Sequence, residues 1–391
     1  MLISADSHVV EPGDLWATRL PAELRDQAPR AVQDPDNHHW YLRGPGMTRG
    51  VDLTLSMCAG MSAAEVNELL ARDRDAHVGV YGGSDPVARI RDLWRDNTVA
   101  DVVYPTCGLS IMQLEDNRLQ QACCRVYNDW MAEFVSADSD RLVGLAMLPS
   151  WDLRVAVEEL KRSHGLGLRG AIIWTAPPGD NGFFDESYEP LWAAAEELGM
   201  PISFHILGGA RSKQGLAEFN TSVRGTFYFT FISRDEVQRS ICEMIAAGVF
   251  ERHPELRVVA AEAGIEWGAT LERTLDNSYR SFWSKLPGAP PLTPSEYFRR
   301  NVYLTFIDDP IGLSNLRFTG ADHFMWSSDY PHLAATWPRS QSVIDTEFGA
   351  ANVSDDDLRR ITLTNVAELY GLDLDTVAQP SRHVDAAPAG V

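Results

Sequence analysis

The chain has 391 residues, of which 45% are hydrophobic and 23% charged, a composition typical of a globular protein with a large core. Its formal net charge of −21 disfavours nucleic acids and anionic membranes as partners, because like charges repel. No apolar run is long enough to cross a bilayer, the N-terminus lacks the pattern of a secretion signal, and the five cysteines show no metal-ligand spacing, so we expect a cytoplasmic protein with reduced thiols.

Short apolar segments alternate with helical patterns along the chain. Compact apolar runs are typical of parallel strands that are buried on both faces. We predict strands over residues 1–8, 99–106, 142–149, 168–174, 201–206, 256–261, 302–306 and 324–328. Helical patterns lie between them over residues 115–136, 153–163, 188–198, 235–247 and 265–281, and a short crossover lies over 309–318. Eight strands alternating with helices predict an α/β fold, a (β/α)8 TIM barrel.

Two segments depart from a minimal barrel. Residues 9–95 form a connection far longer than usual, and we expect this insertion to fold over the barrel mouth as a cap. Residues 373–391 are rich in Pro, Ala and polar residues and are predicted to be a disordered tail. We therefore interpret residues 1–372 as a single barrel domain.

Acidic and imidazole side chains recur at, or just after, the predicted strand ends. They are Asp6, His8, Glu11, His205, Glu262 and Asp329. The carboxyl ends of barrel strands converge on one mouth, so these residues would surround a single cavity and bind metal there. A set so rich in oxygen suits iron or manganese better than zinc.

Each of these residues, taken singly, also fits a structural role. Glu262 follows four apolar residues, and pairing with an arginine is the alternative to a bound cation. The strand period of two places Asp6 and His8 on the same side of the first strand. His332 lies three residues after Asp329 and is a candidate ligand or proton-transfer group.

Cationic residues follow His205 in the connection over residues 208–225. Arg211, Lys213 and Arg224 could receive a carboxylate or phosphate of a small-molecule substrate. Solvated surface charge explains the same residues equally well.

Several segments together resemble a known family. SADSHVVEP, FHILGG, ELRVVAAEAGIEW, WSSDYPH and LTNVAELYGL are similar to the amidohydrolase-related group of the amidohydrolase superfamily, over residues 3–372. The resemblance implies a distorted TIM barrel that holds metal through its first, fifth, sixth and eighth strands. Asp6 and His8 match the first-strand pair, His205 the fifth-strand ligand and Asp329 the eighth-strand aspartate. Glu262 stands where many relatives have histidine, and this added oxygen donor would suit a second cation.

The resemblance implies two competing functions. The DSHVVE and EAG-I-x-W features are similar to non-haem diiron monooxygenases of this group, which implies two irons, with zinc or manganese as alternatives, and an external electron donor. Such an enzyme would hydroxylate an unactivated C–H bond of a hydrophobic carboxylic acid or its thioester. The alternative is a metal-dependent hydrolase or non-oxidative decarboxylase. Asp329 and His332 are the predicted catalytic residues, and a homo-oligomer is compatible with either function.

Overall fold

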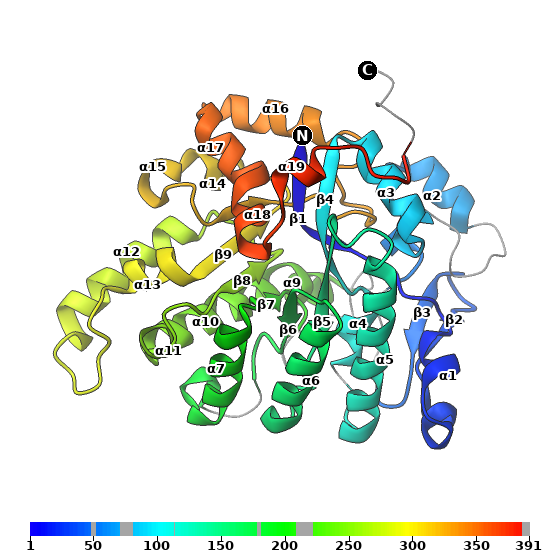
Figure 1. Cartoon of the computed structure of the whole chain (residues 1–391), viewed down its shortest axis with the longest axis horizontal. Helices are drawn as coiled ribbons and strands as arrows, with labels where there is room; N and C mark the ends of the chain where they lie inside the picture. The colour runs from blue at the N-terminus through cyan, green and yellow to red at the C-terminus, as the bar shows by residue number, and fades with distance from the viewer. Residues whose placement is uncertain (48–51, 71–80, 113, 178–180, 209–221, 385–391) are drawn as a thin grey trace.

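The protein was analysed as a computed structural model, which describes residues 1–47, 52–70, 81–112, 114–177, 181–208 and 222–384. Its centre is an eight-stranded sheet with the order β1-β4-β5-β6-β7-β8-β9-β10 (Figure 1), in which all seven neighbouring pairs are parallel. The strands are β1 (Leu2–His8), β4 (Thr98–Tyr104), β5 (Leu142–Met147), β6 (Gly170–Ile172), β7 (Ile202–His205), β8 (Val258–Ala261), β9 (Val302–Phe306) and β10 (Phe324–Trp326). All eight predicted strands are therefore confirmed, each within a few residues.

The two ends of this sheet meet. The Asp329 amide donates a hydrogen bond to the Asp6 carbonyl (3.1 Å), and the His8 amide donates one to the Tyr330 carbonyl (2.6 Å). These bonds join the end of β1 to the loop after β10, so the strands form a nearly closed barrel. The predicted TIM-barrel fold is confirmed.

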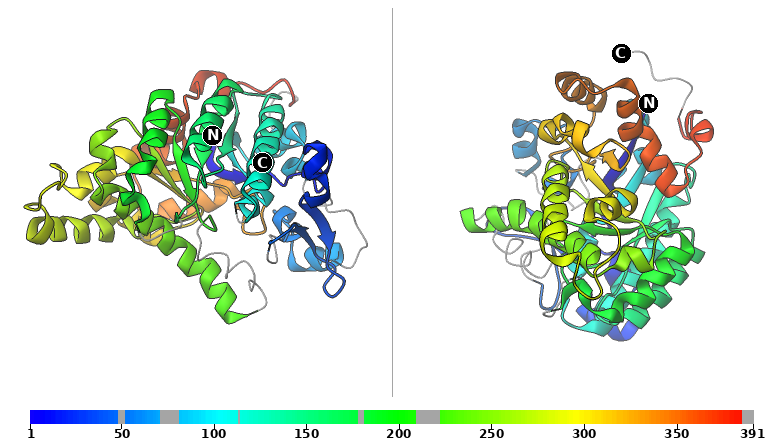
Figure 2. Two further views of the ribbon diagram at one scale, coloured as in Figure 1. Left: turned by 90° about the horizontal axis from the view of Figure 1, so that it is seen from below. Right: turned by 90° about the vertical axis from the view of Figure 1, so that its left-hand side faces the viewer.

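Helices surround the strands and pack against their outer faces (Figures 1 and 2). The longer ones are α3 (Pro86–Arg95), α5 (Asn117–Val135), α6 (Leu153–Gly165), α7 (Glu189–Leu198), α10 (Ser233–Ala246), α12 (Gly268–Ser278) and α16 (Ser340–Ala350). Shorter ones are α1 (Leu15–Arg19), α2 (Ala63–Leu70), α4 (Cys107–Ile111), α9 (Val223–Phe227), α11 (Val249–Arg252), α13 (Pro294–Asn301), α14 (Pro310–Ser314), α15 (Leu316–Thr319), α17 (Asp355–Arg359), α18 (Asn365–Tyr370) and α19 (Leu374–Val377). The predicted helices between the strands are present, and the crossover over residues 309–318 divides into α14 and α15.

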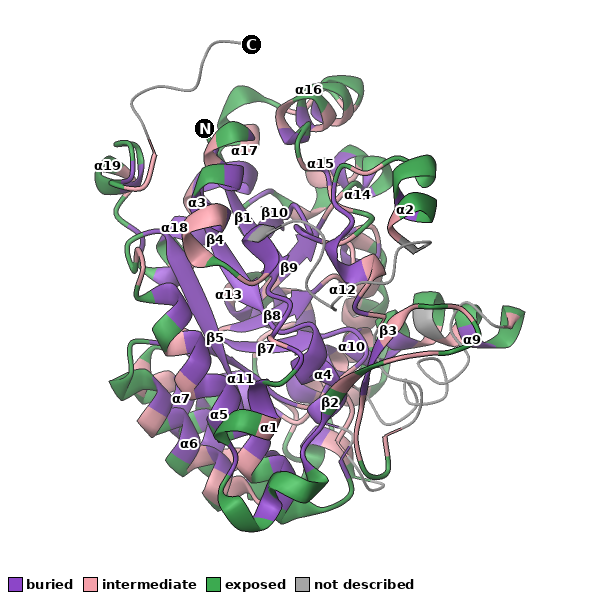
Figure 3. Ribbon diagram, turned by 90° about the vertical axis from the view of Figure 1, so that its right-hand side faces the viewer, coloured by how far each residue is buried: buried purple, intermediate pink, exposed green. Residues whose placement is uncertain are grey.

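Local signals in the sequence set the helix ends. Asp116 caps α5 by accepting a hydrogen bond from the Leu119 amide, and α7 ends at Gly199, whose φ of 62° is easily reached by glycine. Thr293 and Glu296 form a capping box at the start of α13. Figure 3 shows the strands buried while the outer faces of the surrounding helices are exposed.

The insertion over residues 9–95 is described except for residues 48–51 and 71–80, and its described parts contact the loop after β10. It contains the antiparallel pair β2 (Arg30–Gln33) and β3 (Trp40–Arg43) and the helices α1, α2 and α3. The Ala59 amide donates to the Pro331 carbonyl (3.0 Å), and the Val10 amide donates to the Gly83 carbonyl (2.7 Å). These contacts tie the described parts of the insertion to the loop after β10 and to the chain leaving β1.

The C-terminal segment differs from the prediction of a tail beginning at residue 373. Leu374–Val377 form helix α19, and the guanidinium of buried Arg141 donates hydrogen bonds to the carbonyls of Val377 (2.6 Å) and Thr376 (3.1 Å). Burial of Val377 also stabilises this helix against the barrel, although the segment as a whole has a polar composition. Residues 385–391 lie outside the described part. Of the helices in the described part, none combines the length and apolar character needed to cross a membrane.

Candidate metal centre

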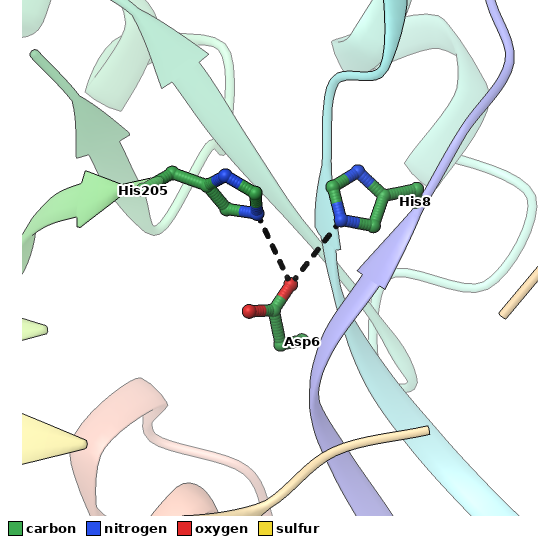
Figure 4. A group of neighbouring side chains, drawn as sticks. All are labelled: Asp6, His8 and His205. Atoms are coloured by element: carbon green, nitrogen blue, oxygen red, sulfur yellow. Dashed lines mark ion pairs between the residues drawn. The ribbon is translucent and has the colours of Figure 1, made fainter. Parts of the chain in front are cut away.

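Asp6, His8 and His205 come together inside the barrel mouth, from β1 and β7 (Figure 4). Oδ1 of Asp6 lies 3.6 Å from Nε2 of His8 and 3.8 Å from Nε2 of His205. The three residues are only 1–2% exposed. Nearly two hundred residues separate Asp6 from His205, and parallel strand order alone brings them to the same end of the barrel.

The remaining strand-end carboxylates face the same centre. Oδ1 of Asp329, after β10, lies 3.7 Å from Nε2 of His8 and 2.9 Å from Nδ1 of His332. Oε2 of Glu262, after β8, lies 3.5 Å from Nε2 of His205. Two overlapping groups of metal-ligand atoms result, with His8 in both: one with Asp6 and His205, the other with Asp329 and His332.

An irregularity in β1 turns the predicted ligands inward. The pairing of β1 with β4 shifts register between Ser4 and Ser7, so β1 contains one more residue in this stretch than the facing part of β4. Ile3 belongs to an apolar cluster with alternate residues of other barrel strands. In a regular strand His8 would point to the opposite face from Ile3, yet its ring also lies in the interior, next to His205. A bulge of this kind allows a strand to aim side chains of both parities at one cavity.

Three buried ligand atoms of this centre make no hydrogen bond within the described part of the chain. They are Oδ1 of Asp6, Nε2 of His8 and Nε2 of His205. Unsatisfied buried polar atoms are costly, and these three need a common partner, since Oδ1 of Asp6 lies 3.6 and 3.8 Å from the two imidazole nitrogens. Nitrogen and oxygen ligands about 2.1 Å from a tetrahedral ion lie about 3.4 Å apart, so the spacing fits a divalent metal.

The other atoms of the same side chains are held in place. Nδ1 of His8 lies 3.0 Å from the Pro105 carbonyl, and Nδ1 of His205 lies 2.8 Å from the Ile206 carbonyl. Because a carbonyl can only accept, each ring carries its proton on Nδ1, and the lone pair of Nε2 is free for a metal. Outer contacts of this type orient histidine ligands in metal sites.

Thr305 of β9 connects two of the carboxylate residues. Its hydroxyl donates to Oδ2 of Asp6 (3.0 Å) and accepts a hydrogen bond from the Glu262 amide (2.8 Å). Asp6 therefore has one oxygen fixed by the protein and one facing the two imidazoles. Thr305 was absent from our sequence prediction, although its position near the end of a predicted strand was a signal that could have identified it.

Burial and like charges shift the pKa values of this centre. Burial, followed by Glu262 and Asp329, raises the pKa of Asp6 well above its usual value. Burial and then Asp329 raise the pKa of Glu262 to about 8. Burial lowers the pKa of His8 well below its usual value and the pKa of His205 to about 4. Without a cation, ionisation of the carboxylates in this site is unfavourable, and the positive charge of a bound divalent ion would favour their ionised forms.

His332 behaves differently from the other two histidines. Burial lowers its pKa, but the charge and hydrogen bond of Asp329, together with the charges of Glu262 and Glu11, raise the pKa overall. Nε2 of His332 lies 3.0 Å from the Thr106 hydroxyl, and its side chain is 22% exposed. An imidazole that touches both an inner carboxylate and the outside of the site can exchange a proton with solvent. Thr106, two residues after the end of β4, was also missed.

The backbone is strained where two of the carboxylates leave their strands. Glu262 has a φ of 56° and Asp329 a φ of 55°, in the left-handed region that non-glycine residues seldom adopt. Such conformations persist only when surrounding structure holds them, and they concentrate at functional sites.

Glu11 takes a position different from the one predicted. Its two carboxylate oxygens accept hydrogen bonds from the backbone amides of Cys107 (2.8 Å) and Gly108 (2.9 Å), at the start of α4. It joins neither of the groups of ligand atoms found in the described residues. The observed geometry therefore indicates that Glu11 anchors the loop after β4, where amides at a helix start favour an anion.

Of the three predicted substrate-binding cations, only Arg224 lies within the described residues. Arg211 and Lys213 lie outside the described residues. Arg224 is exposed, and its guanidinium lies 5.6 Å from the ring centroid of Tyr228. Arg234, at the start of α10, was not predicted, although its charge acts to lower the pKa of Glu262.

Comparisons with known proteins agree with this architecture. Residues 84–372 match the family model described as Amidohydrolase. The gamma-resorcylate decarboxylase of Rhodococcus jostii (strain RHA1) is 29% identical over 272 residues, covering 63% of this chain and 75% of that relative. The 2-amino-3-carboxymuconate-6-semialdehyde decarboxylase of Dictyostelium discoideum is 27% identical over 254 residues, covering 63% and 67%.

Solved structures share the fold. An amidohydrolase from Mycobacterium avium subsp. paratuberculosis K-10 superimposes with a TM-score of 0.73 at 21% identity, covering 95% of this chain and 99% of the other. A dihydroxybenzoic acid decarboxylase from Polaromonas sp. JS666, crystallised with manganese and an inhibitor, superimposes with a TM-score of 0.63 at 18% identity, covering 95% and 97%.

Proposed function

The chain belongs to the amidohydrolase family, and on this premise we propose that it is a metal-dependent, non-oxidative decarboxylase of a hydroxylated aromatic acid or a similar small carboxylate. Relatives that are gamma-resorcylate decarboxylases support this reading. The diiron monooxygenase, our main prediction from the sequence, finds no such support among the relatives named above. It becomes the second candidate.

The observation that carries the proposal is the set of three buried ligand atoms without a partner, on Asp6, His8 and His205. Together with Asp329 these residues would hold the metal, and manganese is the ion named for the Polaromonas decarboxylase. A bound divalent ion supplies a positive charge that attracts a substrate carboxylate and stabilises negative charge during reaction.

Asp329 and His332 are placed to handle the proton that the reaction requires. In a non-oxidative decarboxylation, the ring carbon that carries the carboxylate gains a proton. Its bond to the carboxylate then breaks, the electron pair of that bond restores the ring, and CO2 leaves. We assign the proton donation to Asp329, which regains a proton from Nδ1 of His332 at 2.9 Å. The His332 ring, which contacts the Thr106 hydroxyl through Nε2 and is 22% exposed, then recovers a proton from solvent.

One feature favours the diiron monooxygenase. The Glu262 carboxylate adds an oxygen donor 3.5 Å from Nε2 of His205, and the two groups of ligand atoms that share His8 could serve two ions. Such an enzyme would consume O2 and require an external electron donor. A decarboxylase requires neither.

The two functions can be separated by one experiment. The metal-free protein is loaded with Mn2+ or Fe2+ and incubated in D2O with 2,6-dihydroxybenzoate and other hydroxylated benzoates, with and without O2. Decarboxylation predicts CO2 release, one deuterium on the vacated ring carbon and equal turnover without O2. A hydroxylated product that forms only with O2 and a reductant would replace the proposal with the monooxygenase. The variant Asp329→Asn controls for background decarboxylation.

A further inference from the structure

The guanidinium of Arg89 is fully buried, although it lies on a helix of the insertion. Helix α3 presents Arg89, Ile90 and Leu93 to the interior, and Arg89 is 0% exposed. An arginine is seldom buried completely unless its charge is paired and its N–H groups are bonded. This exception calls for a specific explanation.

All five N–H groups of Arg89 are used. Nε and Nη2 donate to Oδ2 of Asp101 (2.9 and 2.7 Å), and Nη2 also donates to the Ser7 hydroxyl (2.6 Å). Nη1 donates to the backbone carbonyls of His8 (2.7 Å) and Gly82 (3.1 Å). The planar fork of arginine can make these contacts at once, and the single ammonium of lysine cannot.

These bonds hold the backbone of a metal-site residue from outside the barrel. Ser7 faces Asp101 and the helix α3 side, while the His8 imidazole faces the centre. Arg89 therefore binds the strand on the face opposite to the ligand atoms. It touches no atom of the imidazole.

The same helix also holds the loop that carries Asp329. The Arg89 guanidinium lies 5.2 Å from the ring centroid of Tyr330, and the Tyr330 hydroxyl donates to Oδ2 of Asp92 (2.7 Å). The Tyr330 carbonyl in turn accepts from the His8 amide (2.6 Å). Helix α3 thus contacts both sides of the seam where β1 meets the chain after β10.

We propose that Arg89 is a positioning residue of the metal centre, which sets the placement of His8 relative to Asp329 across the barrel seam. Nε2 of His8 and Oδ1 of Asp329 are 3.7 Å apart. Arg89 binds the His8 backbone directly, and α3 contacts the side chain of Tyr330, the residue after Asp329. The inference rests on the proposed metal-dependent function. It adds that helix α3 of the insertion is required for the geometry of the site.

The test compares two arginines that are buried to a similar extent. Arg141 is 5% exposed and donates to the carbonyls of Val99, near the start of β4, and of Val377, at the end of α19. Arg89→Lys and Arg141→Lys should both lower the melting temperature of the metal-free protein. Only Arg89→Lys should weaken Mn2+ binding, by about 10- to 100-fold as is usual for outer contacts of a metal site.

Mn2+ affinity is measured by chelator competition, and the electron paramagnetic resonance signal of bound Mn2+ reports the geometry of the site without turnover. If Arg89→Lys does not fold, Ser7→Ala removes one acceptor of the guanidinium and should weaken Mn2+ binding by a smaller factor. Equal Mn2+ affinity in wild type and the folded variant, or an equal loss in Arg141→Lys, would overturn the positioning role. Failure of wild type to bind Mn2+ would overturn both proposals. Tight binding without decarboxylation would overturn only the proposed reaction.

Discussion

Replacing Glu262 by glutamine should change how the stability of the metal-free protein depends on pH. In the folded protein burial raises the pKa of Glu262 to about 8, whereas the pKa of a glutamate in an unfolded chain is about 4.3. Between these values the folded state holds a proton that the unfolded state has lost. The free energy of unfolding therefore falls as the pH rises. Glutamine cannot ionise, so Glu262→Gln should lack this loss.

The pH range from about 6.5 to 8 is the most informative. Histidines with a lowered pKa make the folded protein more stable as the pH rises, which opposes the effect of Glu262, but they do so mainly below about pH 6.5. His8 and His205 are such residues, and they are neutral in the folded protein throughout this range. At about 1.4 kcal/mol per pH unit the greatest expected loss is about 2 kcal/mol. The Glu262 side chain is 24% exposed, and solvent reduces the effect to about 1 to 2 kcal/mol.

The assay is urea denaturation of the metal-free wild type and of Glu262→Gln at several pH values in this range. The difference in unfolding free energy between the two proteins should grow in favour of the variant as the pH rises. Titrating groups away from Glu262 are common to both proteins and cancel, whereas Asp6 and His332, whose pKa values the Glu262 charge raises, contribute to the difference. Adding Mn2+ should reverse the order, because a bound cation favours the ionised carboxylate. A constant difference across the pH range would refute the assigned protonation state.

Three further predictions follow from the geometry. His205→Ala removes one of the three unpartnered ligand atoms and should abolish tight Mn2+ binding, whereas full metal content in elemental analysis would exclude His205 as a ligand. Asp329→Asn should retain the fold by circular dichroism and lose at least about 100-fold in turnover, the contribution usual for a positioned acid or base, and undiminished turnover would remove it from the proton path. Gly82→Ala would place its Cβ 2.2 Å from the Tyr330 hydroxyl and should lower stability by about 1 to 3 kcal/mol in denaturant titrations. The matched Gly349→Ala, on an open helix face with no atom within 4 Å, should be neutral or stabilising, and equal effects of the two would contradict the packing argument.

The barrel was predictable from the sequence because its signals are local. Each strand is a short apolar run buried on both faces, and helix ends carry their own markers, such as Asp116 before α5 and Gly199 after α7. Once the alternation indicates a barrel, the convergence of residues at strand ends follows from the topology. Asp6, His8, His205, Glu262 and Asp329 were selected on this basis, and the structure brings all five to one centre.

What the sequence did not indicate depends on the paths of loops. Glu11 lies only three residues from His8, yet its oxygens bind the amides at the start of α4, because the chain leaving β1 turns toward that helix. Arg224 follows His205 in sequence, yet it lies on an exposed helix face. Neither direction is encoded in strand periodicity or residue type.

Residue chemistry and spacing by themselves determined that this protein is an α/β barrel whose acids and imidazoles gather at one mouth. Only the tertiary structure decided which atoms lack a partner there, and that Arg89 from the insertion supports the backbone behind His8. The physical reason is that burial and hydrogen bonding are properties of the packed chain. Whether a side chain is a ligand, an anchor or a surface charge depends on which groups from distant parts of the sequence lie next to it in the folded protein.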